Sequence, residues 1–359
     1  MISDSSKATR PPHGARVRVA ICVNPMSGRD VRRLAAQATN VTHEIKRDIV
    51  ARVAAGAHAM GATDIFVTKE PFRIASLALQ HLGLDVRVHV LEPPIDNTAA
   101  DTETAVHAYL GAGCTTLVSI GGDGTNRAIA RALLKAGEGA AGVNLIPLST
   151  GTNNVFPVLA EPTIAGMVAG LLAGGRLDEP ALGQRAKLLH VSGTDANGTS
   201  VADVGLVDAV LLRRDYVGNL LPFDAERIDR ILLTRAEPNA VGTSPIGGLL
   251  EVLEAADDEG LLVEMGPGVE FLVPLSPGAF QNVSVRSITR IPMNTPVSFR
   301  GPGVLALDGD RDHKLSADGG LTVCIRRDGP KVVDLDAAMR WVAGQGIIAP
   351  SLKKQLLNP

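Results

Sequence analysis

Aromatic residues and positive charge are both scarce in this chain of 359 residues. Phe, Tyr and Trp together make up 3% of the sequence, which is too few for a platform that stacks the bases of single-stranded nucleic acid. The formal net charge is −3, whereas a protein that binds a phosphate backbone carries a basic excess. The composition therefore predicts that nucleic acid is not a partner.

Several common site motifs are missing as well. The three cysteines, Cys22, Cys114 and Cys324, are odd in number and form no CxxC pair, so we interpret them as buried thiols in a reducing compartment. No HExxH occurs, which predicts that no zinc site is built in. The absence of a GxxxxGK[ST] segment excludes a P-loop enzyme, and the absence of GxSxG disfavours a hydrolase with a nucleophile elbow.

Long apolar runs are also absent. The nearest candidate, residues 162–175, is shorter than the roughly 18 residues that a membrane span needs, and it predicts a buried helix. Residues 1–16 are polar and contain no apolar signal-peptide segment, so we expect a disordered tail. These patterns predict a cytoplasmic protein without stable membrane insertion.

Residues 17–157 show the alternation of an α/β domain. Short, β-branched apolar segments predict buried strands at 17–23, 64–68, 85–91, 115–120 and 143–148. Between them, apolar residues recur at helical spacing and predict helices that begin near Thr42 and that span 72–82, 98–112 and 126–136. Strands that alternate with helices of this length indicate βαβ units and a parallel sheet.

The pattern changes in the second half of the chain. An apolar helix is predicted at 162–173, and from about residue 186 short β-rich segments are joined by turns of Gly, Pro, Asn and Asp. We therefore predict a mainly antiparallel, β-rich domain over residues 158–333, interrupted by one helix at 224–236. Helices at 334–344 and 351–357 are expected to return to the first domain, so that residues 334–359 pack on it.

The turn after the predicted strand at 115–120 has the strongest signature of a ligand site. Three glycines lie in it: Gly121, Gly122 and Gly124. Without Cβ atoms, they let the backbone approach a ligand closely. Thr125 or Asn126 would then begin a helix, whose free N–H groups attract phosphate. In open α/β sheets such sites lie at the carboxyl ends of the strands.

A single acid, Asp123, lies among these glycines. A carboxylate opposes an incoming phosphate, so we predict that it accepts a proton from a hydroxyl or holds a metal–phosphate group. The alternative is a tight turn in which aspartate serves only as a turn former.

Three further turns are rich in polar groups. Residues 146–157 also follow a predicted strand, and the candidate phosphate, ribose or base contacts there are Thr150, Gly151, Thr152, Asn153 and Asn154. The first turn, at 24–30, offers Asn24, Ser27 and Gly28 as a possible nucleotide cradle. Near the end of the second domain, Asp308, Asp310 and Asp312 either bind Mg²⁺ or supply a base, or belong to a simple hairpin turn.

Together these motifs resemble those of one superfamily, which contains the NAD kinases, diacylglycerol kinases and sphingosine kinases. GGDGT after a strand is similar to its signature, and the NPxSG turn at 24–28 is more typical of its lipid-kinase branch. NPMSGRDVRRLAAQA, GGDGTNRAI and LSTGTNNVFP most resemble the AcoX-like branch of the ATP-NAD kinases, which is associated with acetoin catabolism. The resemblance covers residues 17–330 and is specific in the first half.

The resemblance implies an N-terminal parallel α/β domain, a C-terminal β-rich domain and an active site in the cleft between them. It also implies ATP-dependent phosphorylation of a hydroxyl, with NAD as the favoured acceptor and Mg²⁺ carried by the nucleotide phosphates rather than by a built-in site. Asp123 would deprotonate or orient the acceptor hydroxyl, and the glycines with Thr125 would line the phosphates. A homo-oligomer is implied by the superfamily alone.

The chain departs from the superfamily pattern at several points. The Asn-Glu pair of NAD kinases has its nearest match in Ala202-Asp203, so Asp203 is a candidate binding residue without its amide partner. The lipid kinases carry GTGND and DGE, where this chain has TGTNN and DGD, and Asp310 would be the shorter equivalent of the glutamate. Two alternatives therefore stay open: a kinase for a lipid or another metabolite, and a non-catalytic nucleotide-binding accessory protein.

Overall fold

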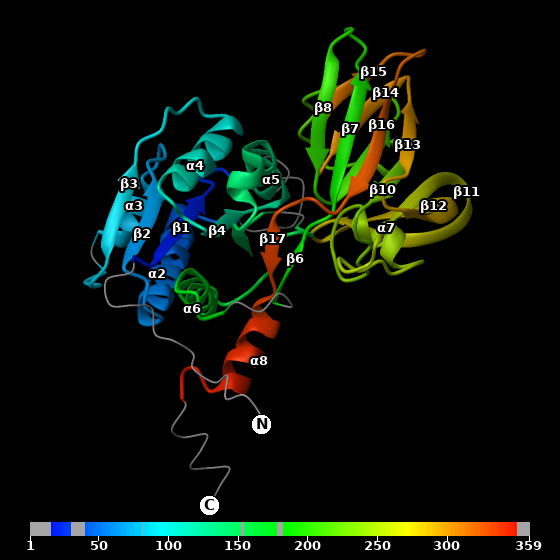
Figure 1. Ribbon diagram of the computed structural model, residues 1–359. Helices are drawn as coiled ribbons and strands as arrows, with labels where there is room; N and C mark the ends of the chain where they lie inside the picture. The colour runs from blue at the N-terminus through cyan, green and yellow to red at the C-terminus, as the bar shows by residue number, and fades with distance from the viewer. Residues whose placement is uncertain (1–15, 30–39, 81, 152–153, 178–181, 350–359) are drawn as a thin grey trace, which may run out of the picture.

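The computed structural model describes residues 16–29, 40–80, 82–151, 154–177 and 182–349. Residues 1–15 of the tail predicted at 1–16, the candidate site residues Thr152 and Asn153, and the helix predicted at 351–357 lie outside these ranges. In Figure 1 the blue and cyan elements of the first domain lie beside the green-to-orange strands of the second. No helix in the described ranges combines the length and the apolar character that a membrane span requires.

The first domain is built on a seven-stranded sheet in the order β3-β2-β1-β4-β5-β17-β6. Its strands are β1 (Arg18–Val23), β2 (Asp64–Thr68), β3 (Arg87–Leu91), β4 (Thr116–Gly121), β5 (Asn144–Ser149), β17 (Lys331–Val333) and β6 (Gly183–Arg185). The pairs from β3 to β17 are parallel, and β6 is antiparallel to β17. Every residue of β2 and β4 is buried, as expected for central strands of a sheet that is covered on both faces.

Helices cover both faces of this sheet. The helices are α2 (His43–Ala59), α3 (Ile74–Leu79), α4 (Ala100–Gly111), α5 (Asp123–Ala136), α6 (Pro162–Ala173) and α8 (Leu335–Gln345), and a 3-10 turn, η1 (Gly137–Ala140), follows α5. One apolar core joins α2, α3, α6 and α8 to the sheet, and the other joins α4 and α5 to it. Thr42 accepts a hydrogen bond from the Ile45 N–H, so it caps α2 as its sequence position predicts.

The second domain consists of antiparallel strands in two sheets. One sheet has the order β12-β11-β10-β9-β14-β15, and the other has the order β13-β16-β7-β8. The strands are β7 (Leu188–Thr194), β8 (Ser200–Gly205), β9 (Asp208–Leu212), β10 (Ile228–Leu233), β11 (Glu259–Ser276), β12 (Ala279–Pro292), β13 (Pro296–Arg300), β14 (Gly303–Leu307), β15 (Asp310–Leu315) and β16 (Gly320–Arg326), with a short helix α7 (Ser244–Gly248). The predicted fold class, a parallel α/β domain followed by a β-rich domain, is confirmed.

The helix predicted at 224–236 is wrong. A 3-10 turn, η3 (Ala225–Arg227), is followed directly by β10, which pairs with β9 and β11. Apolar residues at 228, 231 and 232 fit a helical period, but the buried pair of neighbouring strands supplies the hydrogen bonds that make this segment a strand. The structure of residues 228–233 is therefore determined by pairing with strands distant in the sequence and not by local periodicity.

The structure also departs from the predicted boundary between the domains. Helix α6 packs on α2, and glycines allow close contact there, because a Cβ on Gly166 would lie 2.1 Å from the carbonyl oxygen of Val53. Strands β6 and β17 complete the first sheet, although they flank the second domain in sequence. Helix α8 follows β17 and joins the core of the first domain (Figure 1).

Candidate functional site

A cavity of about 630 Å³ lies where the first domain meets the second. The chain runs from β1 to β2 and β3 in one direction across the sheet, while β4 and β5 lie on the other side of β1. The loops that follow β1 and β4 therefore meet at a topological switch point, where ligands of open α/β sheets bind. The predicted site residues that line the cavity are Asn24, Ser27, Gly28, Gly122, Asp123, Gly124, Thr125, Gly151, Asn154, Asp308 and Asp310.

The first turn is fastened to the start of helix α5. The Asn24 Nδ2 donates to the Thr125 hydroxyl (2.8 Å), and the Asn24 Oδ1 accepts from the backbone N–H of Met26 (2.9 Å). Beneath this turn, the fully buried Lys46 donates from Nζ to the carbonyl oxygens of Asn24 (2.9 Å) and Pro25 (2.7 Å). The sequence thus gives the turn a fixed shape rather than a loose polar surface.

Glycines let the three turns of the first domain touch backbone to backbone. Gly28 has a φ of +69°, and a Cβ there would lie 2.1 Å from the carbonyl oxygen of Thr150. A Cβ on Gly151 would lie 2.8 Å from the Cα of Gly122. The Thr150 hydroxyl, which is buried, donates to the Ser27 hydroxyl (3.2 Å) and so joins the first and third turns. Glycine is needed at position 121 for a different reason, because a Cβ there would lie 2.4 Å from the Thr125 side chain.

Asp123 is the first residue of α5, and its side chain is held by the turn that follows β5. Its Oδ1 accepts from the Phe156 N–H (2.9 Å), and its Oδ2 accepts from the Val155 N–H (3.2 Å). The residue is 8% exposed and lines the cavity. Burial, with the charge of Asp308 nearby, raises the pKa of Asp123 to about 8. An acid with a pKa near neutrality is suited to exchange protons with a bound hydroxyl.

Two acids of the second domain line the same cavity. Asp308, with a φ of +51°, accepts from the backbone N–H groups of Leu206 (2.8 Å) and Val207 (2.7 Å), and burial raises its pKa. Asp208 accepts from the Thr243 hydroxyl (2.5 Å) through Oδ2, while its buried Oδ1 has no hydrogen-bond partner in the described part of the chain. Burial and the charge of Asp308 raise the pKa of Asp208 to about 7. The cavity therefore has an acidic wall.

Carboxylate oxygens are the ligands that Mg²⁺ prefers, usually one or two from the protein together with phosphate oxygens and waters. The unpartnered Oδ1 of Asp208 and the neighbouring Asp308 fit an ion that arrives on nucleotide phosphates. Six acids and a single lysine, Lys69, line the cavity in the described ranges, so a bound phosphate needs such a counter-charge.

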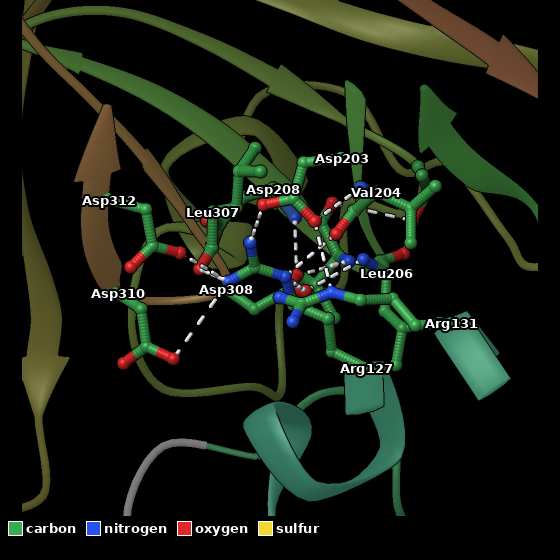
Figure 2. A network of polar contacts seen from close by, with 12 residues as sticks. Arg127, Arg131, Asp203, Val204, Leu206, Asp208, Leu307, Asp308, Asp310 and Asp312 are labelled. Atoms are coloured by element: carbon green, nitrogen blue, oxygen red, sulfur yellow. Dashed lines mark hydrogen bonds and ion pairs between the residues drawn. The ribbon is translucent and has the colours of Figure 1, made fainter. Parts of the chain in front are cut away.

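Asp203 lies outside the cavity lining, which corrects its expected place in the site. Its carboxylate pairs with Arg127 (2.6 Å), Arg131 (3.0 Å) and His313 (3.1 Å), as Figure 2 shows for the two arginines. Although burial alone would raise it, the hydrogen bond from His313 and the charge of Arg127 hold the pKa of Asp203 well below its usual range. The acid of this region that reaches the cavity is Asp208, five residues further along the chain.

Sequence analysis did not name Asp208, Thr243 or Arg127 as site residues. The structure shows that Arg127 is buried, so its charge needs partners that neutralise it. Asp208 and Thr243 come from segments 35 residues apart, and no pattern in the sequence brings them together.

Comparisons with known proteins agree with this architecture. Residues 187–328 match the family model of the acetoin catabolism protein X C-terminal domain. The chain is 31% identical over 335 residues to "Acetoin catabolism protein X" of Cupriavidus necator, a match that covers 90% of this chain and 91% of that protein. Its fold is similar to that of yeast NADH kinase complexed with NADH, with a TM-score of 0.51 and 13% identity over 91% of this chain and 86% of the kinase chain. At that identity the similarity shows the fold alone.

Proposed function

The chain belongs to the acetoin catabolism protein X family, and on this basis we propose that it is an ATP-dependent kinase that phosphorylates a hydroxyl of a small molecule. One observation carries the proposal. Asp123 stands at the N-terminus of α5, in a cavity at the carboxyl ends of β1 and β4, with its pKa raised to about 8. This is where the parts of a phosphoryl-transfer site would meet: glycine turns for the phosphates and an acid for the hydroxyl proton.

In the proposed reaction, the hydroxyl oxygen of the acceptor attacks the terminal phosphorus of ATP. The bond between that phosphorus and the bridging oxygen of ADP breaks, and the hydroxyl proton passes to the ionised carboxylate of Asp123. Mg²⁺ on the nucleotide phosphates would neutralise their charge, and Asp208 and Asp308 are the residues that would hold it. The N–H groups of Val155 and Phe156 keep the carboxylate of Asp123 in place during the transfer.

We propose NAD as the acceptor, so that the product is NADP. The fold similarity to an NADH kinase and a cavity large enough for a nucleotide support this choice. The name of the curated relative supports a link to acetoin catabolism. The acidic lining favours a second candidate, a nucleotide-binding accessory protein without turnover, because cations that would stabilise a transferring phosphate are few among the described lining residues.

The experiment that tests the function incubates the purified chain with ATP, Mg²⁺ and NAD and follows NADP with an NADP-specific dehydrogenase. Parallel reactions contain NADH, small polyols, or diacylglycerol in vesicles as acceptors. We expect NADP formation that rises as the pH increases toward 8 and that falls at least about 100-fold in Asp123→Asn. Phosphorylation of another acceptor would contradict the NAD assignment alone. Tight nucleotide binding with no turnover of any acceptor, unchanged in Asp123→Asn, would contradict the kinase.

A further inference from the structure

One buried arginine crosses from the first domain into both sheets of the second. Arg127 of α5 is 1% exposed, and its guanidinium points into the second domain (Figure 2). Its Nε donates to the carbonyl oxygen of Val204 in β8 (2.7 Å), and its Nη1 donates to the carbonyl oxygen of Leu307 in β14 (3.2 Å). Strand β8 belongs to one sheet and β14 to the other. A single side chain therefore holds one helix of the first domain and one strand of each sheet.

Both of these strands lead directly to the acids of the cavity. Leu307 is followed by Asp308, and the chain beyond β8 passes through Leu206 and Val207 to Asp208. Asp308 accepts hydrogen bonds from the N–H groups of Leu206 and Val207, so it fastens the two segments to each other. The segments that Arg127 holds are therefore the ones that place Asp208 and Asp308.

Asp123 lies one helical turn before Arg127 on α5, and residues four apart share one face of a helix. Arg127 thus links the helix that carries Asp123 to the segments that carry Asp208 and Asp308. We propose that Arg127 is a positioning residue, which sets the acids of the second domain against Asp123 across the cavity. This inference rests on the proposed function for its effect on catalysis, but the geometry that it predicts can be measured without turnover.

Arginine suits position 127 because the side chain has partners in several directions around its guanidinium group. Besides the two carbonyl oxygens, Nη2 donates to Asp203 (2.6 Å) and Nη1 pairs with Asp312 (2.9 Å). The guanidinium offers five donors in a planar fork, whereas the lysine ammonium is a point charge at the end of a flexible chain. Lysine would keep the charge among the carboxylates but could not hold β8 and β14 together.

The chain supplies a matched control in Arg131, which lies one turn further along α5. It shares the partner Asp203 (3.0 Å), and its other ion pair is with Glu103 of the first domain (3.3 Å). Arg131→Met therefore removes a charge from the same helix and the same network without removing a donor to the β8 or β14 carbonyls.

The experiment compares Arg127→Lys, Arg127→Met and Arg131→Met in the full chain. Hydrogen–deuterium exchange is measured at residues 204–208 and 306–310, and steady-state kinetics with ATP and NAD are measured on the same samples. We expect at least about 10-fold faster exchange in these two segments for Arg127→Lys, and no comparable change for Arg131→Met. For Arg127→Lys we expect kcat to fall at least about 10-fold, and for Arg131→Met we expect no comparable fall.

Arg127→Lys keeps the buried charge paired, so it serves as the test if Arg127→Met does not fold. Wild-type exchange and kcat in Arg127→Lys would overturn the positioning role, as would equal acceleration in Arg131→Met. If the wild type turns over no acceptor, the proposed function fails, but the exchange rates still decide whether Arg127 holds the two segments.

Discussion

Asparagine in place of Asp123 should make the fold more stable at alkaline pH and less stable at acidic pH. The folded protein holds the protonated form of this acid, because burial raises its pKa from 3.8 to about 8. The stability that the protonated carboxyl contributes is complete below pH 3.8 and is lost as the pH rises toward 8. Asparagine has nearly the same shape and carries no charge, so its contribution to stability does not change over this range.

The size of the effect follows from the pKa. A rise from 3.8 to about 8 corresponds to about 6 kcal/mol of stability lost above both values. Asp208 and Asp308 titrate beside Asp123, so the removal of one charge lets a neighbour ionise more readily, and the expected net gain is about 1–3 kcal/mol at pH 8.5. At pH 5 the variant should be less stable by about 0.5–1.5 kcal/mol, because the amide nitrogen cannot accept the hydrogen bond from Val155.

Urea unfolding of both proteins at pH 5 and pH 8.5 measures the difference, with fluorescence of Trp341 and circular dichroism as probes. Asp336→Asn is the matched control, since Asp336 also lies in the first turn of a helix but is exposed. Its free energy of unfolding should change by less than about 0.5 kcal/mol at either pH. A loss of stability in Asp123→Asn that is equal at both pH values would refute the reasoning, because the carboxyl would then be an ordinary hydrogen-bond acceptor.

Two further substitutions test the backbone contacts and the acidic wall. Gly28→Ala should cost more than about 2 kcal/mol of unfolding free energy, because φ is +69° and a Cβ would clash with the carbonyl oxygen of Thr150. The control Gly175→Ala, where φ is +63° and the space around the Cβ is open, should cost about 1 kcal/mol. Equal costs in the two variants would show that the turns do not touch. Thr243→Val should destabilise the fold by about 1–2 kcal/mol and raise the pKa of Asp208 above its value of about 7, because the hydroxyl that donates to the Asp208 carboxylate is lost. Carboxyl NMR titration measures this pKa, and an unchanged titration would contradict the hydrogen bond between Thr243 and Asp208.

The sequence predicted most of the first domain because its structure follows from local patterns. Buried parallel strands are continuous apolar segments, and the observed β4 and β5 lie within one or two residues of the predicted bounds. The turns after β1, β4 and β5 could be brought together in advance, since carboxyl ends of parallel strands share one edge of a sheet. The start of α5 is the exception, because the helix already begins at Asp123 rather than near Asn126.

The second domain was predictable only as a class. The β10 strand was mistaken for a helix because its apolar residues fit a helical period, and its pairing with β9 and β11 depends on residues elsewhere in the chain. Arg185 of β6 pairs with Lys331 of β17, 146 residues further along the chain, so the membership of these two strands in the first sheet could not follow from a local pattern. Asp203 was named as the nearest match to the acid of the Asn-Glu pair in NAD kinases, and only the fold shows that Asp208 is the acid that lines the cavity.

The distribution of charge around α5 argues that the cavity is a functional site rather than a packing defect. Where α5 meets β8, Arg127 and Arg131 neutralise Asp203, so that the acid is held ionised within a paired network. On the cavity side, Asp123 and Asp208 are buried, their pKa values are raised, and a carboxylate oxygen of Asp208 lacks a hydrogen-bond partner in the described ranges. The same fold that pairs Asp203 with two arginines leaves Asp123 and Asp208 without an ion pair among the described residues. Buried acids without a compensating charge make the fold less stable. They are typical of sites where the acids bind a cation or exchange a proton with a bound hydroxyl.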